Sequence, residues 1–130
     1  MLTLFFHLSF SLVTQAKPND IINRLGKQNY IFINFYCPSC QHSQKSLPIW
    51  EQISEIYKEN NRFEFYRIDC DRYHSMCKEL GASGYPTFSI ALPGHKSIIR
   101  YNRGIDVEQF ITWVRQNTGI RPPNLINQEL

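Results

Sequence analysis

Apolar and polar residues follow two different patterns along this chain, and these patterns predict alternating strands and helices. Runs rich in β-branched and aromatic residues predict strands at 30–36, 63–69, 87–92 and 97–101. Helices are predicted at 19–27, 40–60, 73–80 and from Asp106 onward. The last helix begins with a capping box, since Gln109 follows Asp106 after three residues. This alternation predicts an α/β fold with a central mixed β-sheet flanked by helices.

The N-terminal segment supports two interpretations. Residues 2–13 are apolar, softened by Ser, Thr and His, and residues 14–16 place small side chains at the two positions that a signal peptidase recognises. We therefore predict a signal peptide over residues 1–16, followed by a single domain with a short C-terminal tail over residues 17–130. The alternative is that residues 2–13 form the first strand of the domain. Cleavage after Ala16 would leave the domain without that outer strand.

Composition and charge narrow the range of functions. The chain of 130 residues has 14 Lys and Arg against 11 Asp and Glu, and its basic residues are scattered rather than grouped with aromatic side chains. This pattern does not favour nucleic acid as a partner. The sequence has no glycine-rich phosphate loop, and its four His lack paired spacing, so neither a cofactor nor a metal is predicted. No segment of residues 17–130 is apolar for long enough to span a membrane.

Two cysteines follow the strand predicted at 30–36. Cys37 and Cys40 form a Cys-x-x-Cys motif, a spacing typical of redox sites when it comes directly after a buried strand. Cys40 lies at the start of the long helix predicted at 40–60. Unpaired backbone N–H groups and the helix dipole favour a thiolate there, and the thiolate is the attacking species in disulfide exchange.

The residues around these cysteines resemble the protein disulfide isomerase branch of the thioredoxin superfamily, whose motif is Phe-Tyr-Ala-Pro-Trp-Cys-Gly-His-Cys-Lys. A gapless alignment matches the Phe-Tyr and Pro positions and places Cys40 on the family's nucleophile. It also places His42 on the motif histidine, which stabilises the thiolate in relatives, and Ser43 on the second cysteine. Pro48 and Trp50 fall on the helix Pro and Trp of the family. The resemblance therefore implies a single-thiol Cys-x-x-Ser variant.

The resemblance covers roughly residues 19–117 and implies a thioredoxin fold. Residues 84–88 match a Gly-Tyr-Pro-Thr element in which relatives hold a cis proline that faces the nucleophile, and whose neighbouring backbone pairs with substrate. Pro86 is assigned that role on this basis. Tyr36 and Tyr85 flank the predicted site and are predicted to contact unfolded substrate.

The two remaining cysteines are Cys70 and Cys77. A group of disulfide isomerase relatives carries a structural disulfide at these positions, so the resemblance implies one here. Such a disulfide would close a short loop and persist in an oxidising compartment.

A single-thiol site predicts a changed mechanism. Ser43 cannot release a mixed disulfide formed at Cys40, because it has no thiol with which to close an internal disulfide. Asn34 stands where relatives carry a buried Glu or Asp that accepts the proton of the second thiol, and Ile105 stands where they commonly carry an Arg that assists the same step. We therefore hypothesise that efficient net oxidation or reduction is lost, while mixed-disulfide capture and isomerisation remain.

Cys37 leaves an alternative open. It lies within disulfide reach of Cys40 if the loop bends, in which case it would resolve the mixed disulfide from upstream and restore dithiol chemistry. Equally, Cys37 would be a small, half-buried residue at the Ala position of the family motif.

These features predict thiol–disulfide exchange of the protein disulfide isomerase type, assisting the folding of secretory proteins through mixed disulfides at Cys40. One alternative is a binding module that tethers cysteine-bearing clients without turnover. A second is a dithiol oxidoreductase that uses Cys37 and Cys40, and a third is a redox-inactive domain that binds peptide beside Tyr85 and Pro86.

The C-terminus predicts a cellular location. Residues Asn127–Leu130 are similar to the Lys-Asp-Glu-Leu signal, which a retention receptor reads in the early secretory pathway. The predicted location is the lumen of the endoplasmic reticulum, and the alternative is secretion. The predicted partners are unfolded or cysteine-bearing secretory proteins.

Overall fold

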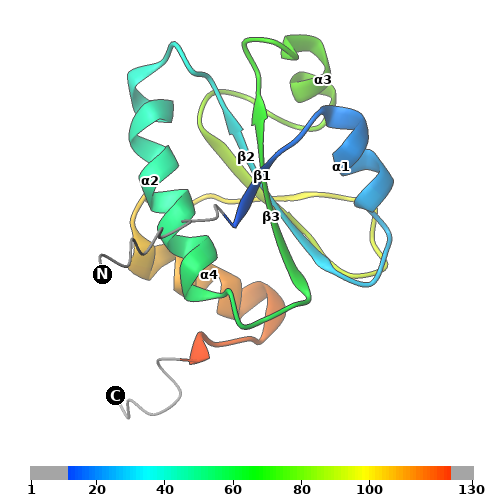
Figure 1. Cartoon of the computed structure of the whole chain (residues 1–130), viewed down its shortest axis with the longest axis vertical. Coiled ribbons are helices and arrows are strands. Elements are labelled where there is room, and N and C mark those ends of the chain that lie inside the picture. The colour runs from blue at the N-terminus through cyan, green and yellow to red at the C-terminus, as the bar shows by residue number, and fades with distance from the viewer. Residues whose placement is uncertain (1–11, 124–130) are drawn as a thin grey trace, which may run out of the picture.

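The computed structural model of the protein describes residues 12–123 as a five-stranded sheet with helices on both faces (Figure 1). The strands are β1 (Val13–Gln15), β2 (Tyr30–Tyr36), β3 (Phe63–Asp69), β4 (Thr87–Ala91) and β5 (Ile99–Arg100). They lie in the order β1-β3-β2-β4-β5. β1, β3 and β2 are parallel, whereas β4 pairs antiparallel with both β2 and β5. The predicted mixed sheet and α/β class are therefore confirmed.

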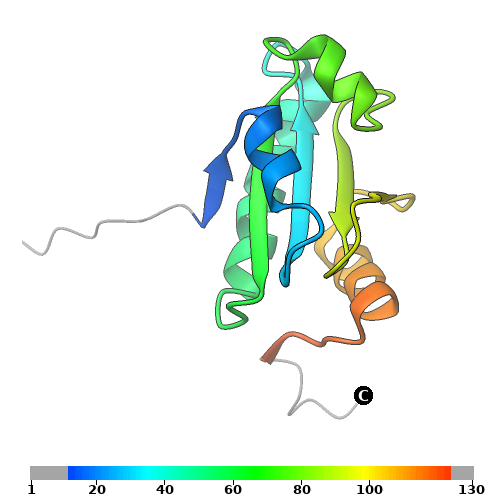
Figure 2. The same ribbon diagram turned by 90° about the vertical axis from the view of Figure 1, so that its right-hand side faces the viewer.

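Four helices cover the sheet within residues 12–123: α1 (Pro18–Arg24), α2 (Gln41–Ile56), α3 (His74–Glu79) and α4 (Val107–Thr118). α2 and α4 pack on one face, and α1 and α3 lie on the other, as the view turned by 90° makes clear (Figure 2). Each face therefore buries its own apolar cluster, which gives the molecule three layers.

The two faces of the sheet have different cores. The face under α2 and α4 is aromatic: the rings of Phe32 and Phe65 stack with centroids 4.6 Å apart, and Trp50 stacks on Phe88 at 5.1 Å. The face under α1 and α3 is mainly aliphatic and includes Ile21 among its fully buried residues. Because both faces are covered, the central strand β2 is an almost uninterrupted apolar run.

The register of the parallel strands positions the loops that follow them. Tyr36 pairs with Asp69 at the carboxyl ends of β2 and β3, and the Cys70 N–H donates to the Tyr36 carbonyl at 2.8 Å. The loop after β2 and the loop after β3 therefore leave the sheet side by side. α2 begins at Gln41, only a few residues beyond β2.

The bounds of three predicted helices differ from the structure: α1 ends at Arg24 instead of residue 27, α3 spans His74–Glu79 instead of 73–80, and α2 differs most. α2 ends at Ile56, four residues before the predicted end, because the chain turns at Tyr57 toward β3. At α4, the Asp106 carboxylate accepts from the Gln109 N–H at 2.9 Å, as a capping box requires. The reciprocal bond is different: the Gln109 side chain accepts from the N–H of Gly104 at 3.0 Å, and the Asp106 N–H donates to the Gly104 carbonyl.

β1 lies inside the range assigned to a signal peptide. Val13–Gln15 pairs with β3, and Val13 and Ala16 are buried. The outer strand of the sheet is thus formed by residues 13–15, whereas the alternative interpretation assigned it to residues 2–13. Cleavage after Ala16 would remove β1 and its pairing with β3. Residues 1–11 lie outside the described residues, so the signal peptide stays a prediction.

Candidate active site

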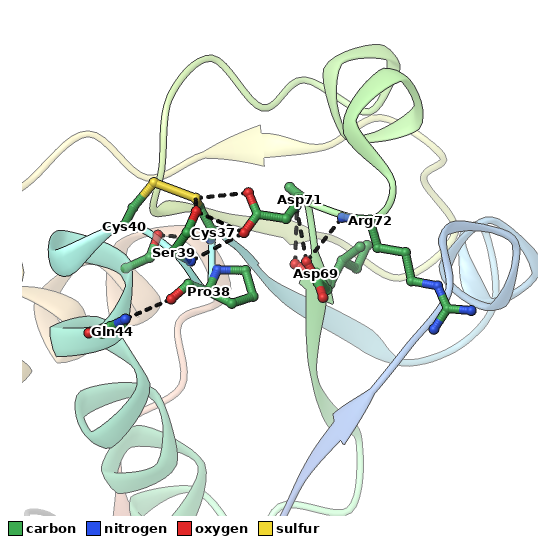
Figure 3. Close-up of a disulfide and its surroundings, with 11 residues drawn as sticks. Cys37, Pro38, Ser39, Cys40, Gln44, Asp69, Asp71 and Arg72 are labelled. Carbon is green, nitrogen blue, oxygen red and sulfur yellow. Dashed lines mark hydrogen bonds between the residues drawn. A yellow bond between two sulfur atoms is a disulfide. The ribbon is translucent and has the colours of Figure 1, made fainter.

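Cys37 and Cys40 are joined by a disulfide at the end of β2 (Figure 3). Their sulfur atoms are 2.34 Å apart and their Cα atoms 5.3 Å apart. The Cys40 N–H donates to the Cys37 carbonyl at 3.0 Å, which closes a tight turn through Pro38 and Ser39. A proline after Cys37 fixes one backbone angle of this turn. The turn thereby brings the two cysteines together.

The prediction of a single-thiol Cys-x-x-Ser site at Cys40 is wrong. The structure pairs Cys40 with Cys37, so the site is a Cys-x-x-Cys dithiol in its oxidised form. The physical reason is the turn at residues 38 and 39, which bends the loop enough for the upstream cysteine to reach the start of α2. The hypothesis that net oxidation and reduction are lost rested on a lone thiol, and that premise does not hold.

The two cysteines of the pair have different surroundings. Cys37 is buried, with 5% of its surface exposed, whereas Cys40 is partly exposed. Cys40 is also the N-cap residue of α2, directly ahead of its first turn. Its sulfur is therefore the one that meets solvent and the positive end of the helix dipole. This asymmetry distinguishes an attacking cysteine from a shielded one.

A buried polar layer lies beneath the disulfide. Ser43, Ser46 and Asn34 are all fully buried. The Cys37 N–H donates to the Ser43 hydroxyl at 2.9 Å, and the Asn34 amide donates to the Ser46 hydroxyl at 3.4 Å. The Oδ1 atom of Asn34 has no hydrogen-bond partner among residues 12–123. Ser43 thus holds the loop that carries Cys37, in the position where relatives have their second cysteine.

A carboxylate from the loop after β3 lies against the disulfide. Asp71 Oδ1 is 3.1 Å from Cys37 Sγ, and its Oδ2 accepts from the Ser39 N–H at 3.2 Å and from the Ser39 hydroxyl at 3.0 Å (Figure 3). The Asp69 carboxylate in turn accepts from the N–H groups of Asp71 and Arg72, at 3.0 and 3.2 Å. Asp71 is therefore held in a tight turn that directs its carboxylate toward Cys37.

The remaining predicted site residues lie around this centre. His42 is exposed in the first turn of α2, and the Tyr85–Pro86 peptide bond is cis with both residues half-buried. Tyr36 is different, since it is buried and its hydroxyl donates to the Gln15 side chain at 3.0 Å. The phenol of Tyr36 thus faces β1.

The second disulfide that the resemblance implied is present in the structure. Cys70 and Cys77 form a disulfide, with Cα atoms 5.9 Å apart, which ties the loop after β3 to α3. Ile105, at the position where relatives carry an Arg, is 43% exposed. The neighbouring Arg103 donates a hydrogen bond to Gln116 of α4.

Sequence reasoning missed Asp71, Ser39 and Gln44. The Gln44 side chain donates to the Pro38 carbonyl at 2.7 Å and thereby ties the turn to α2. The one available signal was the strand pattern, because a polar residue just after β3 lies at the same sheet edge as the end of β2 in any parallel pair. That argument places Asp71 at the correct edge of the sheet but does not identify Cys37 as the residue that it contacts.

Residues 12–123 contain neither a metal-binding cluster nor a membrane-spanning helix. No three His, Cys, Asp or Glu side chains of this part of the chain group closely enough to hold a metal ion. None of its helices combines the length and the apolar character needed to cross a membrane.

Comparison with known proteins gives a consistent result. The thioredoxin family model matches residues 10–116. The chain is 27% identical over 95 residues to protein disulfide isomerase-like 2-2 of Oryza sativa subsp. japonica, a match that covers 73% of this chain and 26% of that protein. It is 28% identical over 108 residues to endoplasmic reticulum resident protein 44 of Homo sapiens, which covers 80% of this chain and 27% of that protein.

Solved structures agree with these matches. The crystal structure of human ERp44 form I superimposes with a TM-score of 0.71 and 27% identity, covering 84% of this chain and 30% of that one. The Trx4 domain of ERdj5 superimposes with a TM-score of 0.72 at 18% identity, which supports the fold alone, and the match covers 83% of this chain and 96% of that one. The chain spans about a quarter of the length of the curated relatives named above.

Proposed function

This chain belongs to the thioredoxin family, and on that basis we propose that it exchanges thiols and disulfides with cysteine-bearing proteins through its Cys37–Cys40 pair. The observation that carries the proposal is the disulfide between a buried cysteine and a partly exposed cysteine at a helix N-terminus. Relatives named as protein disulfide isomerases support this class of reaction. The reaction is a two-electron transfer that needs no metal or organic cofactor.

Oxidation of a client begins with the disulfide form. A client thiolate attacks Cys40 Sγ, the Cys37–Cys40 bond breaks, and Cys37 leaves with the bonding electron pair and takes up a proton. A second client thiolate then attacks the client sulfur of the mixed disulfide, and Cys40 leaves as the thiolate. The client has lost two electrons and two protons, and the protein has become a dithiol.

Reduction of a client is the reverse sequence. The Cys40 thiolate attacks a client disulfide and releases one client thiol. Cys37 then loses its proton and attacks Cys40 Sγ, which releases the second client thiol and restores the Cys37–Cys40 disulfide. Cys37 thus takes the resolving role that the family assigns to the position of Ser43, but from the upstream side of the nucleophile.

Exposure decides which cysteine reacts with the client. Cys40 is the more accessible sulfur, and the N-terminus of α2 stabilises its thiolate. Cys37 is 5% exposed and lies under the turn at residues 38 and 39, so a client sulfur cannot reach it without opening that turn. We place the client beside Tyr85 and Pro86, which are half-buried and precede β4.

Single substitutions of the two cysteines test this function. The assay follows oxidation of a peptide with two cysteines by the protein in a glutathione buffer, with mass spectrometry of trapped adducts. We expect wild type to turn over, Cys37→Ala to accumulate a peptide adduct at Cys40 with at least a ten-fold loss of turnover, and Cys40→Ala to lose both. The double variant Cys70→Ala/Cys77→Ala is the control, because its Cys37–Cys40 pair is intact.

The same assay separates the alternatives. Capture of the peptide by wild type without turnover would overturn the oxidoreductase proposal in favour of a tethering module. Turnover by Cys37→Ala at the wild-type rate would show that Cys37 does not resolve the mixed disulfide.

We further propose that the protein acts in the lumen of the endoplasmic reticulum. Support comes from the relative named as resident in that compartment, from two disulfides, which persist in oxidising compartments, and from the predicted segments at residues 1–16 and Asn127–Leu130. The C-terminal segment lies outside the described residues. Expression of the full chain with and without residues 127–130 tests the proposal: we expect removal to cause secretion, and a cytosolic location of the full chain would refute it.

A further inference from the structure

We propose that Asp71 is a positioning residue that keeps the Cys37 thiol protonated in the reduced protein, so that Cys40 alone is the attacking thiolate. This inference rests on the proposed function, in which Cys37 and Cys40 have different roles. It concerns a residue that lies 34 positions away from Cys37 in the sequence.

The geometry of the carboxylate carries the argument. Asp71 Oδ1 is 3.1 Å from Cys37 Sγ, while Oδ2 is held by the backbone and the hydroxyl of Ser39. A disulfide sulfur carries no hydrogen, so the oxidised site gains no hydrogen bond from this approach. After reduction, the Cys37 thiol can donate to the same oxygen. The carboxylate is therefore placed where it favours the thiol form of Cys37 over every other form.

A thiolate at Cys37 would meet the opposite situation. Two negative charges about 3 Å apart repel each other, and a nearby like charge disfavours ionisation of an acid. Cys37 is also buried, which disfavours its charged form in the same direction. Cys40 faces the helix N-terminus instead, which favours its thiolate. The two environments therefore favour the neutral thiol at Cys37 and the thiolate at Cys40.

The other charged groups of this corner do not offset Asp71. Asp69 has the same sign, and its carboxylate accepts from two backbone N–H groups of its own loop. Figure 3 shows the Arg72 side chain extending away from the disulfide, and its guanidinium lies over the Tyr73 ring at 5.5 Å. His42, two residues after Cys40 in the first turn of α2, is exposed. Among the hydrogen-bond contacts of residues 12–123, Asp71 is the charged group that reaches Cys37.

The inference also accounts for the loss of a family feature. Relatives place a buried acid beneath their second cysteine, and this chain has Asn34 there, bonded to Ser46. Because the resolving cysteine here is Cys37, on the other side of the nucleophile, the acid belongs on that side too. Asp71 supplies it from the loop after β3. In the resolving step, Cys37 loses its proton to solvent past this carboxylate. The Cys37 sulfur then bonds to Cys40 Sγ and breaks the bond between Cys40 and the client. The client leaves as a thiolate, which is then protonated.

The test measures ionisation of Cys37 directly. In a Cys40→Ala background with the Cys70–Cys77 disulfide intact, Cys37 is the only free thiol, and its alkylation by iodoacetamide is followed from pH 5 to 11. We expect Asp71→Asn to lower the pH midpoint by about one unit, a roughly ten-fold rise in thiolate at pH 7. Exposure of Asp71 to solvent limits the effect to this size.

Asp69→Asn is the matched control, because it removes the same charge at the end of β3, out of contact with Cys37, while the amide oxygen can still accept from the N–H groups of Asp71 and Arg72. We expect its midpoint to stay within about 0.3 units of the background variant. A structural loosening would also raise the plateau rate at high pH, where all of the thiol is ionised, whereas removal of the Asp71 charge alone leaves that plateau rate unchanged. Equal midpoints for Asp71→Asn and Asp69→Asn would overturn the proposal.

The outcome is independent of catalysis. Absence of turnover in the wild-type protein would remove the proposed function, while the shift of the Cys37 midpoint would still decide the role of Asp71.

Discussion

The Cys37 N–H donates a hydrogen bond to the hydroxyl of Ser43 at 2.9 Å, and both groups are buried. This bond joins the loop after β2 to the first turn of α2, in the position where family relatives carry their second active-site cysteine. The serine that replaces that cysteine therefore has a structural task. It fixes the backbone of the resolving cysteine, whose sulfur must reach Cys40.

Removal of the Ser43 hydroxyl leaves the buried Cys37 N–H without this acceptor. We expect Ser43→Ala to lower the free energy of unfolding of the oxidised protein by about 1–2 kcal/mol, the usual cost of an unsatisfied buried donor. Denaturant unfolding followed by circular dichroism measures the change. Ser54→Ala is the control in the same helix, because the Ser54 hydroxyl donates to the Glu51 carbonyl in the preceding turn of α2 and not to another segment of residues 12–123. An equal loss in both variants would contradict the assigned role.

The Cys70–Cys77 disulfide closes a loop of eight residues between β3 and α3. Closing such a loop limits the freedom of the unfolded chain, and the chain-entropy estimate gives about 2–3 kcal/mol for it. We expect Cys70→Ala/Cys77→Ala to lose about that much stability in thermal and denaturant unfolding. A wild-type melting temperature for the double variant would show that the loop is held by other contacts.

Glu64 links β3 to α1 through a charged network. The Arg24 guanidinium donates to both of its oxygens, at 3.0 and 2.6 Å, and the Asn29 amide and the Tyr66 hydroxyl donate to it as well. Burial raises the pKa of Glu64, but the hydrogen bonds from Arg24, Tyr66 and Asn29 outweigh it, so this pKa lies below its ordinary value. A lowered folded-state pKa stabilises the fold above the unfolded value of about 4.3, and the contribution is lost as the pH falls through the folded value.

We therefore expect Glu64→Gln to cost about 1–2 kcal/mol at pH 7 and progressively less below about pH 4. Denaturant unfolding from pH 2 to 8 gives both curves. Glu55→Gln removes an exposed i,i+3 pair with Lys58 and should change stability by less than about 0.5 kcal/mol at any pH. A difference in the free energy of unfolding between Glu64→Gln and wild type that stays constant across this pH range would refute the link between the Glu64 pKa and stability.

Tyr57 packs in the aromatic core with 1% of its surface exposed, and its hydroxyl has no hydrogen-bond partner among the described residues. Burial raises its pKa, so the group is a neutral phenol. Because an unpaired buried hydroxyl is costly, we expect Tyr57→Phe to raise the free energy of unfolding by about 1 kcal/mol. Tyr101→Phe is the opposite case, since the Tyr101 hydroxyl donates to the Gly104 carbonyl, and it should lower stability. A loss of stability in Tyr57→Phe would show that its hydroxyl has a partner.

The apolar pattern determined most of the elements, because strand and helix formation depend on neighbouring residues. The apolar run at 30–36 forms β2 with the predicted bounds. Cys40 lies directly before α2, which begins at Gln41. The alignment with the family motif also identified Ser43 as the residue that stands in place of the second cysteine, and Ser43 is buried in the first turn of α2. These assignments depend on spacings of a few residues, which the sequence displays directly.

Only the tertiary structure decided how the site works. The spacing of Cys37 and Cys40 allowed both a bonded pair and a lone thiol, and the turn between them selected the pair. The approach of Asp71 to Cys37 depends on the register of two parallel strands, which sets Tyr36 opposite Asp69 and so places the two following loops together. Register is a property of the packed sheet, since the burial of both faces selects it at once.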